Sequence, residues 1–201
     1  ICQNKWVKHN APYNALSLYI LTRPQNAQKL LMAIPRKVLD IAKLYWISDS
    51  NENEEDGYGS RRLMDIEYKF GLRDFEYRNN YSQAGADQTP IYTLLCVSPG
   101  ETIDFIIELI NYSIEYYYTS ANDSNDIEEI DVYHSGTIIK QLGSYYLWGI
   151  YRGAIHTTIP CLLQSIHMAL EKYLLELDKY NTELVRTILD YMLLKSRSVS
   201  L

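Results

Sequence analysis

The sequence predicts a mainly α-helical fold: a layered, helical-repeat-like array of antiparallel helix pairs, with one small β-hairpin near residues 129–141. Apolar side chains recur every three or four residues through most of the chain, which is the period of a helix face. Prolines stand in the first turn of several such stretches, where a missing amide hydrogen costs little. Two stretches, separated by about 75 residues, also resemble each other, which is suggestive of stacked helix pairs.

The first of these stretches lies in the N-terminal quarter of the chain. A short helix is expected over Pro12–Leu21, and a second helix begins at Pro24. Pro35 should break the second helix, because its ring removes a backbone donor and clashes with the preceding turn. The apolar pattern then resumes at Val38, Ile41, Ala42 and Tyr45.

The second stretch begins with a short apolar helix over Pro90–Val97. The next residues, Ser98-Pro99-Gly100-Glu101, favour a helix start, since Ser98 can accept from free amides and Glu101 can complete a capping box. This helix is expected to reach about Tyr118 and to be buried over Ile103–Ile114.

Acidic polar loops are expected over residues 48–60 and 122–129. Between the first loop and Pro90 the pattern leaves two structures open. Alternation of Met64, Ile66, Tyr68 and Phe70 with charged residues favours a strand, whereas the spacing of Leu63, Ile66 and Phe70 fits a helix equally well.

The C-terminal part of the chain begins with the expected hairpin. Strands over Glu129–Tyr133 and Thr137–Gln141 would pair around a turn at His134-Ser135-Gly136. A short helix over Tyr145–Tyr151 would follow and end at Gly153.

Two longer helices complete the chain. The more regular one begins at Pro160 and ends near Lys179, and the last spans about Thr182–Leu194. The first has one apolar stripe at Leu163, Ile166, Leu170, Tyr173, Leu174 and Leu177. Met168 and Leu175 form a second stripe, which predicts burial on two sides. The last helix should turn Leu184, Val185, Ile188, Tyr191 and Met192 inward. We therefore expect one helical module with three segments, residues 1–57, 58–121 and 122–201.

Composition narrows the classes of function. A net charge of −6 argues against a nucleic-acid surface, and no apolar run is long enough to suggest a membrane span. Three widely spaced cysteines indicate a reducing compartment, so the expected location is the cytoplasm. The chain has 19 tyrosines against 3 phenylalanines, which suits half-buried helix faces and protein interfaces.

The sequence carries no recognised motif for catalysis or cofactor binding. The sequence contains no phosphate-binding GxxxxGK[ST] loop and no GxGxxG. Asp49, Asn51 and Asn53 have the spacing of a calcium loop, but Glu54 replaces its glycine and Ser60 its last glutamate. The prediction is therefore no catalytic residue, no metal and no cofactor in this segment.

One catalytic alternative stays open, an all-helical enzyme that uses His156, His167, Glu171 and Arg152 in one pocket. Cys161 lies near these residues as well, but zinc sites need about four convergent ligands, and structural ones usually show paired cysteines. For His167, at the edge of the apolar stripe, a hydrogen-bonded, half-buried imidazole is the simpler interpretation.

A family resemblance is carried by Gln141–Ser144, Leu147–Gly153 and Pro160–Glu176, with weaker support over Gln88–Asn111. These residues resemble a segment of the large bacterial STAND NTPases of the antiviral AVAST type. The resemblance implies a helical region outside the ATPase core. ATP and Mg²⁺ would then bind elsewhere in the parent protein, a viral protein would be the suspected partner, and the parent would form a homo-oligomer.

Within the resembling segment, Trp148, Tyr151 and Arg152 are the candidate site residues. Arg152 would stand at a helix end, where its charge favours the helix dipole, and Trp148 one turn earlier could stack under it. The favoured interpretation is an internal brace, and the alternative is a contact with a partner. A stand-alone helical adaptor remains the second hypothesis for the chain as a whole.

Overall fold

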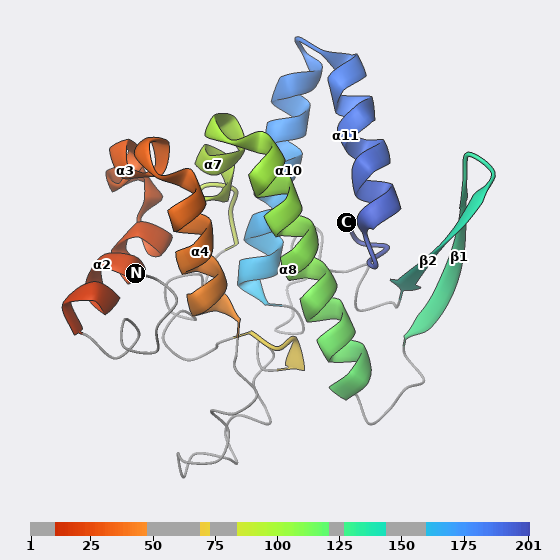
Figure 1. Ribbon diagram of the computed structural model, residues 1–201, viewed down its shortest axis with the longest axis horizontal. Coiled ribbons are helices and arrows are strands. Elements are labelled where there is room, and N and C mark those ends of the chain that lie inside the picture. The colour runs from red at the N-terminus through yellow and green to blue at the C-terminus, as the bar shows by residue number, and fades with distance from the viewer. Residues whose placement is uncertain (1–10, 48–68, 73–83, 121–126, 144–159) are drawn as a thin grey trace.

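A computed structural model describes residues 11–47, 69–72, 84–120, 127–143 and 160–201 of the chain (Figure 1). The expected acidic loops, apart from residues 127–129, and the expected helix over Tyr145–Tyr151 lie outside these residues, as does most of the ambiguous segment before Pro90. Within the described residues, no helix combines the length and the apolar character needed to cross a bilayer.

The fold is mainly helical, with one two-stranded antiparallel sheet, as predicted. The elements in chain order are α2 (Ala11–Thr22), η1 (Pro24–Asn26), α3 (Gln28–Ala33), α4 (Pro35–Trp46), α7 (Ile91–Val97), α8 (Pro99–Ser120), β1 (Glu128–His134), β2 (Thr137–Gly143), α10 (Cys161–Asp178) and α11 (Thr182–Lys195).

Prolines set most of the helix starts. Pro35 begins α4 directly after α3 ends, which confirms the predicted break. Pro90 and Pro160 are the N-cap residues of α7 and α10. The helix expected to run from Pro24 is instead divided into η1 and α3, because Ala27 between them leaves the helical conformation.

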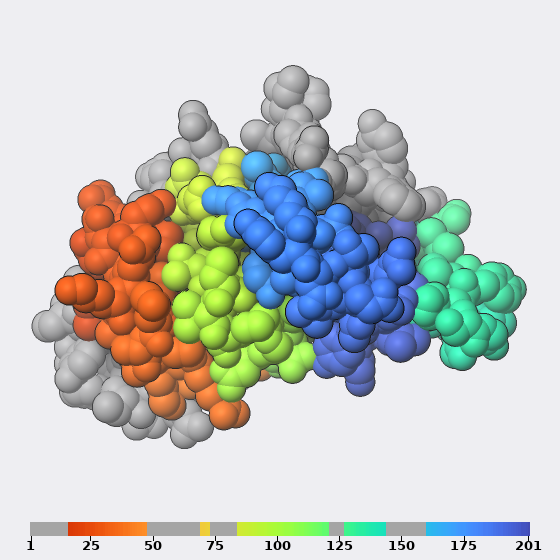
Figure 2. All heavy atoms as spheres, turned by 90° about the horizontal axis from the view of Figure 1, so that it is seen from above, coloured from red at the N-terminus to blue at the C-terminus, as the bar shows by residue number. Residues whose placement is uncertain are grey.

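Helix α8 lies at the centre of the packing. It contacts α4 and α11 as well as its neighbour α7, while α10 packs on α7 and α11 (Figures 1 and 2). Its predicted burial over Ile103–Ile114 is confirmed for the apolar side chains of that run. Trp46 at the end of α4 meets Phe105 of α8, with ring centroids 6.0 Å apart. The core is therefore continuous from the N-terminal helices to α11.

The two C-terminal helices differ from their predicted burial. In α10, Leu163, Ile166 and Leu170 are buried as expected, but Leu175 is 58% exposed and Met168 is only partly buried. The prediction that both sides of this helix are covered is therefore wrong at Leu175. The physical reason is that α7 packs on the other side of α10, where Tyr92 contacts Lys172 and Glu176, so α11 is the described helix that flanks the side carrying Leu175.

Helix α11 shows the same effect. Val185 and Met192 are buried and Ile188 is partly buried, whereas Leu184 and Tyr191, both predicted to face inward, are exposed. The apolar face of this helix is wider than the contact that α8 and α10 make with it.

The hairpin has a tighter turn than predicted. His134 pairs with Thr137, so the turn has two residues, Ser135 and Gly136, with φ angles of 48° and 78°. Positive φ at both positions defines the turn type whose twist matches that of paired strands. The predicted turn, His134-Ser135-Gly136, is therefore one residue too long, since His134 belongs to β1.

Candidate protein-binding surface

An apolar surface in the described part of the chain lies between α10 and α11. We name it the α10–α11 surface; its exposed apolar members are Leu175 and Leu189. Single exposed leucines are ordinary, but Leu175 and Leu189 border the same groove and form one patch with its apolar lining. Patches of this kind mark sites of protein contact.

A groove of about 460 Å³ runs along this surface between the two helices. Leu170, Leu174 and Leu175 line it from α10, Val185 and Leu189 from α11. The last residues of the chain, Ser200 and Leu201, also line it. Its walls are mainly apolar, and the charged side chains of Asp178 and Arg186 lie at its margin. An apolar centre with a charged rim is the usual anatomy of a protein interface.

His167 is the one histidine that lines this groove, and it is 5% exposed. Its Nδ1 donates a hydrogen bond to the carbonyl of Leu163, 2.8 Å away and one turn earlier in α10. Burial lowers the pKa of the imidazole below its usual range, and the hydrogen bond to Leu163 opposes this shift only in part. His167 is therefore neutral at physiological pH, with Nε2 as an acceptor that has no partner among the described residues.

Two of the four residues of the catalytic alternative can be placed. His167 and Glu171 both line the groove, one helical turn apart on α10. His156 and Arg152 lie outside the described residues, as do the other candidates, Trp148 and Tyr151. The described residues contain no group of three His, Cys, Asp or Glu side chains that could hold a metal ion. Cys161 is partly exposed at the start of α10.

A polar cluster fixes the opposite face of α10 on α7. The Tyr92 hydroxyl donates to Glu176, and this hydrogen bond, with burial, raises the pKa of Tyr92 well above its usual value. Lys172 lies 4.0 Å from the centroid of the same ring and 3.0 Å from an Asp87 carboxylate oxygen. The cluster joins α10 to the segment before α7, so the groove on the other side of α10 has a fixed wall.

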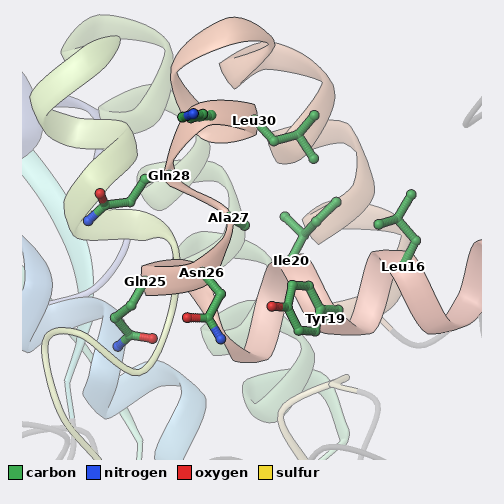
Figure 3. A pocket seen from close by; sticks show the side chains of 9 residues that line it. Leu16, Tyr19, Ile20, Gln25, Asn26, Ala27, Gln28 and Leu30 are labelled. Atoms are coloured by element: carbon green, nitrogen blue, oxygen red, sulfur yellow. The ribbon is translucent and has the colours of Figure 1, made fainter.

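A second groove, of about 440 Å³, lies at the other end of the molecule (Figure 3). Leu16 and Ile20 of α2 project toward Leu30 of α3, whereas the side chains of Gln25 and Gln28 point away from them. Gln25 donates to the carbonyl of Asp87, which ties η1 to the segment before α7. Two exposed apolar side chains, Leu16 and Tyr19, line this groove.

The groove between α10 and α11 was not predicted from the sequence, although the second apolar stripe of α10 is a signal for it. Met168 and Leu175 form the second apolar stripe of α10, and the structure leaves that stripe partly uncovered instead of sandwiching it. No protein-family model matches the chain, and no curated protein is significantly similar to it.

Proposed function

We propose that this chain is a helical sensing or regulatory module of a STAND-type antiviral defence ATPase, and that it binds a protein partner through the α10–α11 surface rather than catalysing a reaction. The observation that carries the proposal is the open apolar groove between α10 and α11, bordered by the exposed side chains of Leu175 and Leu189. The sequence resemblance over residues 141–176 includes most of α10, and this helix forms one wall of the groove.

The chemistry of the surface favours a protein over a small molecule as the partner. The groove is open along the two helices, and the exposed side chains of Leu175 and Leu189 border it from its two walls, which suits a partner that lies along it. Burying such side chains contributes roughly 25 cal/mol per Å² of apolar area. A partner helix or loop laid along the groove would cover them, while Asp178 and Arg186 would form part of its polar rim.

The remaining parts of this proposal concern the parent protein. ATP and Mg²⁺ would bind to its ATPase core, in the cytoplasm, and a viral protein would be recognised by the helical region. Binding would promote assembly of the parent into an oligomer. In this proposal the present segment contributes no catalytic residue and acts through the partner that it holds.

The test uses the full parent protein, with Leu175→Asp and Leu189→Asp introduced separately and together. Both side chains are exposed, so these changes should alter the free energy of unfolding by no more than about 0.5 kcal/mol each. Protection of bacteria from phage, and the ATP hydrolysis stimulated by the phage protein, should both be lost. Met32→Asp is the matched control, since Met32 is equally exposed but lies on α3.

Retention of phage protection and stimulated ATP hydrolysis in the double variant would refute the role of this surface. The upstream reading frame separates the proposal from the adaptor hypothesis. A phosphate-binding loop encoded there favours the STAND ATPase, whereas a short frame without one favours the adaptor.

A further inference from the structure

The hairpin lies at one end of the molecule, beside α11 (Figures 1 and 2). One edge of its sheet is already in use: the Leu142 N–H donates to the Arg197 carbonyl at 2.6 Å, and the Leu142 carbonyl accepts from the Val199 N–H at 3.1 Å. The C-terminal segment thus covers β2 at this point, in a parallel bridge between Leu142 and Ser198. The other edge of the sheet is β1.

The contacts of Leu142 determine which groups β1 presents at its outer edge. Both backbone groups of Leu142 point away from β1, so Leu142 and its register partner Glu129 form a non-hydrogen-bonded pair. Because such pairs alternate along an antiparallel ladder, Glu129, Asp131 and Tyr133 direct their N–H and C=O groups outward. No strand in the described part of the chain pairs with this edge.

The side chains of these three residues share one face of the sheet. Tyr133 is 77% exposed and stands opposite Ile138, which is 52% exposed, so an apolar pair lies near the end of the hairpin. Asp131 stands opposite Lys140, but Lys140 bonds to Glu129 at 2.9 Å. Among the described residues no cation bonds directly to Asp131, whose charge acts on Lys140 only from across the pair, so the edge combines a carboxylate open to a direct contact with an exposed aromatic ring.

We infer that the outer edge of β1 receives an extended, basic segment of a protein partner, which adds to the sheet as a further strand. The backbone of Glu129, Asp131 and Tyr133 would pair with the segment, a lysine or arginine would face Asp131, and an aromatic or β-branched side chain would cover Tyr133. Edge strands bind partners in this way because their unpaired groups are a template for another strand. A two-stranded sheet, marginal alone, also gains stability from a third strand.

A second copy of this chain fits the edge less well. Antiparallel pairing of two β1 strands about Asp131 would bring two carboxylates directly opposite each other, and like charges in that position destabilise a ladder. The inference shares with the proposed function only that the partner is a protein. The surface is a different one, so either can fail while the other holds.

The experiment uses the whole chain and a labelled peptide of about eight residues that alternates lysine with valine around a central tyrosine. Fluorescence anisotropy should show saturable binding, and amide resonances of Glu129, Asp131 and Tyr133 should shift. Asp131→Lys should weaken binding by about tenfold or more, and Asp131→Asn by less, because repulsion replaces attraction in the first and only attraction is lost in the second. Asp40→Lys makes the same charge change on α4, away from both proposed surfaces, and should bind as the parent does.

Two peptides that are N-methylated at alternate sets of residues test the strand pairing itself. Methylation on the edge that faces β1 should abolish binding, and methylation on the opposite edge should leave it intact. Equal binding by both peptides, or equal loss from Asp131→Lys and Asp40→Lys, would overturn the inference, since charge alone would then explain the contact. Concentration-dependent dimerisation that Tyr133→Ala abolishes would also overturn it, in favour of a second copy.

Discussion

Asn111 of α8 holds the backbone of Arg197, two residues beyond the end of α11. The Arg197 N–H donates to Asn111 Oδ1 at 2.7 Å, and Asn111 Nδ2 donates to the Lys195 carbonyl at 2.9 Å. Lys195 is the last residue of α11, so its carbonyl has no partner within the helix. One side chain thus caps a helix and fixes the segment that pairs with β2 at Leu142.

Replacing Asn111 with alanine should therefore loosen both α11 and the hairpin. The loss of two hydrogen bonds predicts a decrease of about 1–2 kcal/mol in the free energy of unfolding, measured by urea denaturation. Asn26→Ala, at an exposed position of η1, is the matched control and should have little effect. Equal effects of the two substitutions would show that Asn111 has no special role.

Leu170 and Leu175 lie on the same helix and differ in burial, at 4% and 58% exposed. Leu170→Ala should lower the free energy of unfolding by about 2–5 kcal/mol, because it removes buried methyl groups and leaves a cavity. Leu175→Ala should change it by no more than about 0.5 kcal/mol. A large loss of stability from Leu175→Ala would mean that the exposed end of α10 is covered in solution.

Because His167 is buried, the stability of the folded chain should depend on pH. Burial lowers the pKa of the folded state, whereas the unfolded chain titrates near the usual value of about 6.5. Below that value the unfolded chain binds a proton that the folded chain does not, so stability falls as the pH falls. His167→Leu should raise the melting temperature at about pH 5.5 relative to the parent chain and change it little at about pH 7.5.

The control for this titration is His134→Gln, which removes a less buried imidazole from β1. The acid-dependent loss of stability should persist in that variant. Curves of melting temperature against pH that coincide for His167→Leu and the parent chain would contradict the assignment of this effect to His167.

Gly71 should tolerate no side chain. Its φ angle is +67°, and an added Cβ would lie 2.7 Å from Cγ of Tyr116 on α8. Gly71→Ala combines backbone strain with overpacking, so a loss of about 2 kcal/mol or more is expected by thermal denaturation. Gly100→Ala is the control, because an added Cβ there meets no atom within 4 Å. Equal stability of the two variants would contradict the close approach of Gly71 to α8.

The helices could be predicted because their signals are local. Pro35 ends one helix and begins the next whatever surrounds it, and the spacing of Leu163, Ile166 and Leu170 identifies the buried face of α10. The Tyr92–Glu176 contact has no such signal, because its partners are 84 residues apart and meet only when α7 packs on α10. Trp148, Tyr151 and Arg152, the predicted site, lie outside the described residues, so their role stays a prediction.

By itself, the sequence determined the helical class, the breaks at prolines and the presence of the hairpin, since backbone sterics and hydrophobic period act over a few residues. Only the tertiary structure decided which apolar faces are covered. Leu163 and Leu175 both belong to apolar stripes of α10, yet one is fully buried and the other exposed. The difference arises because Leu175 lies on the side of α10 that faces the open groove, whereas α7 packs on the side of Glu176, and which side a neighbour covers depends on contacts between residues far apart in the chain.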